Sequence, residues 1–182
     1  WDFALFDDDK TANAFCLPGG KVGVYTGILP VAENEAALAA ILGHEVAHAV
    51  VRHSAERLTQ SLVVEVGLSA ADIGLSNNKY KDLILAGLGV GAKFGVMLPY
   101  SREHEAEADL IGLRYMAQAG YDPNEAVALW HRMAKQGARV PEFLSTPPDP
   151  ENRAKTLQAQ LKSVLPLFER SDKQPSTSLP AK

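Results

Sequence analysis

The chain has a single cysteine, Cys16, among its 182 residues. One cysteine excludes an internal disulfide, and it also excludes a zinc site that is built from several thiolates. Basic residues are in the minority, because 18 Lys and Arg stand against 22 Asp and Glu and give a formal net charge of −4. Proteins that bind nucleic acid usually carry a basic stripe, so we expect no nucleic acid among the partners of this chain.

Long hydrophobic runs are also lacking. The most apolar stretch, residues 83–98, is too short to span a bilayer and contains Lys93, although it could lie against a membrane or cover a site. No signal peptide is visible before the strand-like opening "WDFALF", so we expect residues upstream of it to have been removed. The length predicts one domain over residues 1–168, and the polar composition predicts a disordered tail over residues 169–182.

The order of apolar and polar residues predicts strands first and helices afterwards. Residues 1–6 alternate, and glycines mark turns around a strand at residues 21–26. Helical patterns begin at Asn34, a candidate cap, and cover residues 34–60, two segments within 61–99 that "SNNKYKD" separates, and residues 101–120, 121–137 and 152–165. Ser101 is expected to cap the helix that Gly120 ends. We therefore predict an α+β, mainly α-helical fold with a small N-terminal sheet.

The segment "GHEVAH" has the most specific chemistry in the chain. His44 and His48 are four residues apart, so on a helix both imidazoles point to one side and can bind one ion, at ~2.0–2.1 Å each for zinc. Glu45 lies one residue round the helix, where its carboxylate can take a proton from a water on the metal. The alternative is an accidental match within an apolar helix, but two buried histidines beside a buried acid would be costly without a metal. The motif therefore favours zinc.

A catalytic zinc site with two histidines needs a third protein ligand, which the segment "SREHEAEAD" can supply. Glu105 and Asp109 fall on a mostly apolar helical face, whereas the other two glutamates of the segment fall elsewhere. Buried acids need partners. We expect Glu105 to bind the metal and Asp109 to accept the free N–H of a zinc histidine, which would fix that ring. The alternative is that both acids form salt bridges with Arg102 or Arg114.

Three segments together resemble the gluzincin peptidases of the CaaX prenyl endopeptidase, HtpX, Oma and BepA type: "NAFCLPGGKVGVYTGIL", "ENEAALAAILGHEVAHAVVRH" and "SREHEAEADLIGLRYMAQAGYDP". The resemblance covers residues 13–153. Within the family, the chain looks most similar to the bacterial branch whose members are soluble and are exported or attached to a membrane. It implies a zincin-like catalytic domain with one Zn²⁺ per chain, bound by His44, His48 and Glu105, with Glu45 as the catalytic acid and base. It also implies a location in the bacterial periplasm or attached to a membrane.

The resemblance further implies that the segment "LPGGKVGVYTG" borders the cleft, where an extended substrate can add as a further strand. The residues whose backbone would hold the peptide are Gly20, Lys21, Val22, Gly23 and Val24. Arg153 matches an arginine of the family, and it is expected either to face the site or to lie on the surface as a helix cap. Many members have Thr-His-Pro in the loop before this arginine, but here Thr146 is followed by Pro147, so that histidine is absent.

The remaining histidines and the cysteine have structural interpretations. His53 follows His48 by five residues, rather than the six of another zinc motif, so we interpret it as structural. His104 and His131 are expected to be exposed on helices. We expect Cys16 to be a small core residue rather than a nucleophile, because nothing nearby in the sequence would lower its pKa.

These observations predict a zinc-dependent endopeptidase that acts in the quality control of exported or membrane proteins. Its partners would be protein substrates that are unfolded or misfolded, together with a membrane surface. The alternative is a latent protease that acts mainly as a chaperone or adaptor, in which the apolar region 61–99 folds over the cleft as a lid. A purely structural zinc site is less favoured, because three protein ligands leave the fourth position open.

Overall fold

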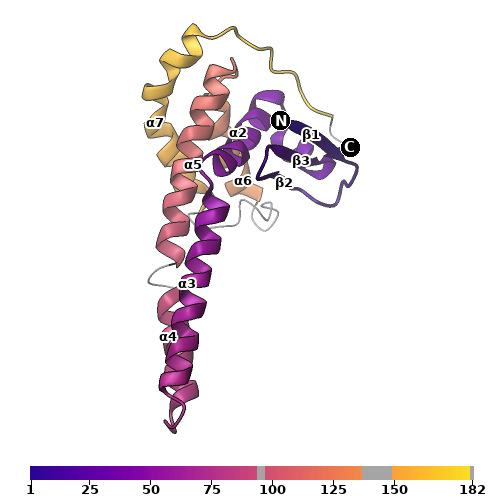
Figure 1. Cartoon of the computed structure of the whole chain (residues 1–182). Coiled ribbons are helices and arrows are strands. Elements are labelled where there is room, and N and C mark those ends of the chain that lie inside the picture. The colour runs from indigo at the N-terminus through magenta and orange to yellow at the C-terminus, as the bar shows by residue number, and fades with distance from the viewer. Residues whose placement is uncertain (94–96, 137–148, 181–182) are drawn as a thin grey trace.

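The computed structural model describes residues 1–93, 97–136 and 149–180, with the side chains of residues 98–100 excepted. A small sheet lies beside a group of helices, and two helices extend from this body as a long hairpin (Figure 1). The elements in chain order are β1 (Asp2–Phe6), β2 (Ala14–Leu17), β3 (Lys21–Tyr25), η1 (Thr26–Ile28), α1 (Leu29–Ala32), α2 (Glu35–Val50), α3 (His53–Gly74), α4 (Lys81–Ala92), α5 (Leu98–Gln118), α6 (Asn124–Gln136) and α7 (Pro150–Arg170). The prediction of an α+β, mainly α-helical fold is confirmed.

The sheet has β3 at its centre. β1 pairs with β3 in parallel and β2 pairs with it antiparallel, which gives the strand order β1-β3-β2. Gly19 and Gly20 make the turn between β2 and β3 at φ angles of 88° and 77°, a conformation that favours glycine. Because both edges of β3 are paired, its backbone groups are already occupied, and β1 and β2 are the edge strands.

The helix expected over residues 34–60 is two helices. Its start is as predicted, because the Asn34 side chain caps α2 by accepting a hydrogen bond from the Ala37 N–H at 2.8 Å. The expected continuation is wrong: Arg52 adopts a left-handed conformation at φ 61°, α2 ends before it and α3 begins at His53. No Gly or Pro marks this position, so the local sequence pattern could not reveal the break.

The ends of the later helices differ from the prediction in detail. α5 begins at Leu98, so Ser101 lies inside the helix and does not cap it. Gly120 follows the end of α5 at φ 88°, as predicted for a helix-ending glycine. α7 is longer than expected at both ends. Asp149 sets its start, because its side chain accepts hydrogen bonds from two backbone N–H groups of the first turn.

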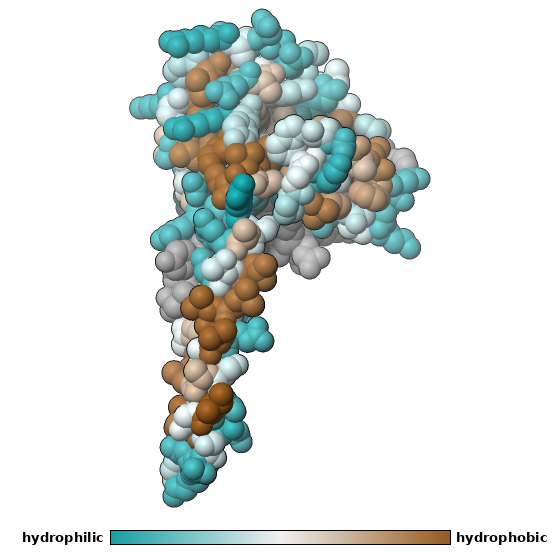
Figure 2. Space-filling model, viewed as in Figure 1, coloured by the Kyte–Doolittle hydropathy of each residue, from teal (hydrophilic) through white to brown (hydrophobic). Residues whose placement is uncertain are grey.

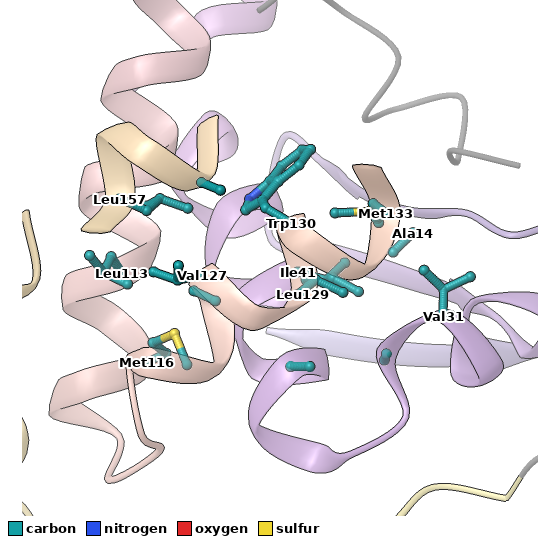
Figure 3. Packing of buried hydrophobic residues seen from close by; sticks show 14 of the residues in the cluster. Ala14, Val31, Ile41, Leu113, Met116, Val127, Leu129, Trp130, Met133 and Leu157 are labelled. Carbon is teal, nitrogen blue, oxygen red and sulfur yellow. The ribbon is translucent and has the colours of Figure 1, made fainter. Parts of the chain in front are cut away.

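The core lies between α2, α5, α6 and α7, and Figure 3 shows side chains from all four helices meeting there. α6 supplies a large share of it, with Trp130 at the centre of the view. The other labelled core residues of these helices are Ile41, Leu113, Met116, Val127, Leu129, Met133 and Leu157. Each fully buried aliphatic side chain of this size contributes ~1.5–3 kcal/mol. This packing holds α2 and α5, which carry the two motifs, in one fixed arrangement.

The α3–α4 hairpin extends away from the body (Figure 1) and has little core of its own. No described residue of α4 is buried, and in α3 only His53 is. Figure 2 shows apolar side chains along this hairpin. The exposed large apolar residues of α3 and α4 include Leu58, Leu62, Val63, Val66, Ile73, Leu83, Ile84, Leu88 and Val90. Among the described residues no helix combines the length and the apolar character that a membrane crossing requires. The two predicted helices are present, but they do not fold over the body as a lid.

Residues 171–180 run back from α7 toward the N-terminal sheet (Figure 1). The backbone N–H of Gln174 donates to the carbonyl of Gly120 at 2.9 Å, and that of Leu179 donates to the carbonyl of Glu33 at 2.8 Å. These hydrogen bonds join the segment to the body, and the disordered tail over residues 169–182 stays a prediction from its polar composition.

Candidate metal centre

The three predicted ligands lie together. His44 and His48 are one turn apart on α2, and their Nε2 atoms are 3.1 Å from each other. The Glu105 carboxylate on α5 faces both rings, with Oε2 3.3 Å from His44 Nε2 and Oε1 3.5 Å from His48 Nε2. A tetrahedral zinc ion with bonds of ~2.0–2.1 Å separates its ligand atoms by ~3.3 Å. The donor set and its spacing therefore fit zinc, and within the described ranges this is the cluster that could hold a metal.

A close approach of two helices brings the ligands together. A Cβ atom on Gly43 would lie 2.8 Å from the carbonyl oxygen of Gly112, and a Cβ on Gly112 would lie 2.7 Å from the backbone nitrogen of His44. Real Cβ atoms do not approach other atoms so closely, so both positions require glycine. The small size of Gly43, noted in the sequence next to the motif, thus lets α5 approach the histidine helix.

Asp109 supports His44 at Nδ1, the ring nitrogen other than the one that faces Glu105, and Arg153 supports Asp109. Asp109 Oδ1 lies 3.0 Å from His44 Nδ1, where it can accept the proton of that nitrogen. The Arg153 guanidinium donates to both carboxylate oxygens of Asp109, with Nε at 2.8 Å from Oδ2, and it lies 3.8 Å from the centre of the Trp130 ring. Arg153 is only 1% exposed. Arg153 therefore faces the site, which is one of the two locations expected for it.

Charged groups surround the three donor atoms. Arg57, near the start of α3, donates to Glu105 Oε1 at 2.9 Å, and Arg153 lies 3.3 Å from Oε2. Burial raises the pKa of Glu105, but the two imidazoles facing it and Arg153 outweigh this and hold the pKa far below its usual range. Burial lowers the pKa of His44, but Asp109 and Glu105 outweigh that and raise it to about 9. The neighbouring groups therefore keep the Glu105 carboxylate ionised, the form in which it can bind a metal.

Glu45 is buried beside the donors and next to β2. Burial raises its pKa to about 7, with His44 opposing the shift and the charge of Glu105 adding to it. α2 packs against β2, the strand that contains Cys16. Burial raises the pKa of the Cys16 thiol, and the charge of Glu45 raises it further. Cys16 is partly exposed, so the expected core location is wrong, although the raised pKa agrees with a thiol that is no nucleophile.

Sequence reasoning did not find the contacts at the start of α3. His53 is buried, with Nδ1 2.8 Å from His48 Nδ1 and Nε2 3.2 Å from Glu107 Oε2. His104, which was expected to be exposed, is buried: its ring stacks on His53 at 4.1 Å, and its Nε2 lies 2.8 Å from Glu56 Oε2. These contacts depend on the break between α2 and α3, which the sequence does not mark.

Arg153 was expected at the site as one of two alternatives, but the salt bridges of the two buried acids were not predicted. Arg57 and Arg153 contact them, rather than Arg102 or Arg114 as the alternative held. Both belong to helices other than α5, so a search for bases along the helix of the acids could not find them. His131 is exposed on α6, as predicted.

The segment expected to hold a substrate as an added strand is only partly placed to do so. Lys21 to Val24 belong to the central strand β3, so a peptide cannot pair with them without displacing β1 or β2. Gly20 lies in the preceding turn, where it lines a pocket together with Trp1 and His48. The edge strand that contacts the histidine helix is β2. Thr146 and Pro147, at the position of the missing family histidine, lie outside the described residues.

The fold and the site define a zincin-like domain, in which two histidines of one helix and a glutamate of another face a common point. A family model described as Peptidase family M48 matches residues 1–161, and the chain belongs to this family.

Similar proteins are metalloendopeptidases and a protease. The mitochondrial metalloendopeptidase OMA1 of Schizosaccharomyces pombe is 44% identical over 169 residues, which cover 90% of this chain and 48% of that protein. OMA1 of Arabidopsis thaliana is 39% identical over 158 residues, which cover 86% of this chain and 31% of that protein. The beta-barrel assembly-enhancing protease of Escherichia coli K12 is 27% identical over 177 residues, which cover 93% of this chain and 36% of that protein. The chain thus spans half or less of the length of these relatives.

Proposed function

We propose that this chain is the catalytic domain of a zinc-dependent endopeptidase, which binds one Zn²⁺ through His44, His48 and Glu105. The observation that carries the proposal is the spacing of the ligand atoms: the two imidazole Nε2 atoms are 3.1 Å apart, and the Glu105 carboxylate oxygens lie 3.3 Å from His44 Nε2 and 3.5 Å from His48 Nε2. Three protein ligands leave a fourth position for water or substrate. The bound ion would lower the pKa of that water and polarise the peptide carbonyl.

Glu45 is the proton carrier in this proposal. Its carboxylate removes a proton from the attacking water and later gives it to the nitrogen of the leaving amine. A group that performs both steps works best when its pKa is near the operating pH, and burial raises the pKa of Glu45 to about 7. Asp109 and Arg153 hold the His44 ring from behind and take no part in the proton transfer.

The substrate, in this proposal, pairs with β2 as an added strand. β2 is an edge strand, it packs on the histidine helix, and the charge of Glu45 reaches Cys16 within it. Backbone hydrogen bonds along such an edge hold a peptide in extended form largely independently of its sequence. Gly20, in the turn after β2, would line the pocket next to His48 for a substrate side chain.

The proposed substrates are unfolded or misfolded proteins of a membrane compartment. In support, one group of relatives is named as mitochondrial and another is named for enhancing β-barrel assembly. We place the protein in the bacterial periplasm or attached to a membrane, as the sequence resemblance implies. The exposed apolar side chains of the α3–α4 hairpin favour a surface that covers them, and a bilayer interface is such a surface.

A second candidate is a latent protease that acts mainly as a chaperone or adaptor. The same exposed apolar hairpin favours it, because apolar side chains of this kind also bind unfolded chains. The two candidates differ in turnover, since a latent protease would bind zinc fully yet cleave unfolded substrates slowly.

The decisive experiment measures zinc content by mass spectrometry together with cleavage of casein. Wild-type protein is expected to contain one zinc per chain and to cleave, whereas Glu105→Gln loses both. Glu103→Gln is the matched control, because this acid lies on the same helix but is exposed. Full zinc without cleavage would favour the latent protein, and no zinc after reconstitution would overturn the proposal.

A further inference from the structure

We infer that His53 is a positioning residue of the metal centre, which accepts a hydrogen bond from His48 and fixes the orientation of that ligand. The inference rests on the proposed zinc site and adds to it a residue that would not touch the metal. His53 lies outside the segments "GHEVAH" and "SREHEAEAD" that supply the predicted ligands, and the sequence analysis interpreted it as structural.

The geometry forms a chain from the site to the surface. His48 directs Nε2 toward Glu105, while its other ring nitrogen, Nδ1, lies 2.8 Å from Nδ1 of His53. The far side of His53 continues the chain, with Nε2 3.2 Å from Glu107 Oε2. The two imidazole rings are 4.9 Å apart at an angle of 69°, so they meet edge to face and do not stack. His53 is 2% exposed, whereas the Glu107 side chain is 55% exposed.

A metal on His48 would set the tautomer of each ring in this chain. A metal-bound Nε2 carries no proton, so the proton of neutral His48 is on Nδ1, which makes that nitrogen a donor. The nitrogen that faces it, His53 Nδ1, must then be an acceptor. Neutral His53 consequently has its proton on Nε2 and donates it to the Glu107 carboxylate. With a proton on His53 Nδ1, two N–H groups would point at each other across 2.8 Å.

The backbone is arranged to make this contact. On an uninterrupted helix, residues five apart are turned ~140° from each other, so His53 could not face His48. The left-handed conformation of Arg52, at φ 61°, ends α2 and starts α3 with His53 as its first residue. A non-glycine residue in this conformation is uncommon, and such conformations cluster at functional sites. The break thus gives the second ligand histidine a partner, as Asp109 does for His44.

The test measures the zinc dissociation constant of the full chain by competition with a chromophoric chelator. His53→Leu replaces the imidazole with an apolar side chain of similar volume and so removes the acceptor nitrogen Nδ1. It is expected to weaken zinc binding ~10–100-fold. His53→Asn places an amide oxygen near the position of Nδ1, so it is expected to recover most of the affinity. Melting of the metal-free variants measures any loss of fold separately.

A second measurement uses wild-type protein and does not depend on a variant that folds. Long-range ¹H–¹⁵N correlation spectra of the zinc-loaded chain report the protonated nitrogen of each histidine ring. We expect His53 to be neutral with its proton on Nε2. A proton on His53 Nδ1 would overturn the inference, and so would equal zinc affinity of wild type and His53→Leu. If His53→Leu and His53→Asn weaken binding equally, the role is packing and the inference also fails. A wild-type chain that binds no zinc would refute the proposed function itself.

Discussion

At the scale of the residue, Arg153 joins three parts of the candidate metal centre. Its guanidinium binds both oxygens of Asp109, lies 3.3 Å from Glu105 Oε2 and covers the Trp130 ring. Arginine suits this place because its planar fork matches a carboxylate and its face stacks on an aromatic ring. A lysine could offer only a point charge to the same groups.

We expect Arg153→Leu to destabilise the metal-free protein by about 3–5 kcal/mol, because Asp109 would be left as a buried charge without its arginine. The free energy of unfolding in urea measures this loss. Adding Asp109→Leu should restore part of it, since an apolar pair carries no buried charge. If the two changes prove simply additive, the pair does not act as a unit.

Glu45 is predicted to matter for turnover and not for metal binding. Glu45→Gln keeps the shape of the side chain but removes its capacity to carry a proton, so kcat should fall at least ~10²-fold. Zinc content by mass spectrometry should stay at the wild-type value. Cleavage by the variant at the wild-type rate would show that another group transfers the proton.

At the scale of the element, the contact between α2 and α5 decides whether a metal can be held. The histidines come from one helix and Glu105 from the other, so the ligand spacing depends on the distance between the two helix axes. Gly43 and Gly112 set that distance, because each lies against the backbone of the opposite helix. The three-stranded sheet adds β2, an edge strand that contacts the same helix.

Gly112→Ala is expected to destabilise the protein by about 1–3 kcal/mol, because the new methyl group would lie 2.7 Å from the His44 backbone nitrogen. Zinc affinity should fall as well, since the helices must move apart. Gly67→Ala is the matched control: it is also a helical glycine, but a Cβ there meets nothing within 4 Å. It should stabilise the protein by ~0.5–1 kcal/mol. Equal melting temperatures for the two variants would contradict this account.

At the scale of the whole molecule, the α3–α4 hairpin stands apart from the body while its base belongs to the site. His53 and Arg57, both near the start of α3, each contact a ligand of the candidate centre. Farther along, the hairpin exposes apolar side chains, with Ile73 at 75% and Leu83 at 73%. One helix therefore connects the metal centre with a surface that is suited to an apolar partner.

We expect the double variant Leu62→Ser and Leu83→Ser to keep the wild-type melting temperature but to lose binding to phosphatidylethanolamine–phosphatidylglycerol vesicles. Both side chains are exposed, so little core packing is lost, whereas burial in a bilayer interface depends on apolar area. Co-sedimentation with the vesicles measures the binding, and Gln158→Ser, at an exposed position on α7, is the control. Wild-type protein that stays in the supernatant would exclude this surface for the hairpin.

The features that depend on neighbouring residues along one helix could be predicted from the sequence. Spacing of four places His44 and His48 on one side of α2, and the apolar face of α5 selects Glu105 and Asp109. The Asn34 cap and the glycine at residue 120 follow from the same local rules.

The features that join distant parts of the chain depend on how the helices and strands pack. The left-handed Arg52, the partners Arg57, His53 and Arg153, and the central place of β3 all come from contacts between elements. No local pattern marks them, because each depends on which surfaces meet after the helices pack. The candidate ligands can therefore be predicted from the sequence. The groups that orient them and shift their pKa values depend on the fold.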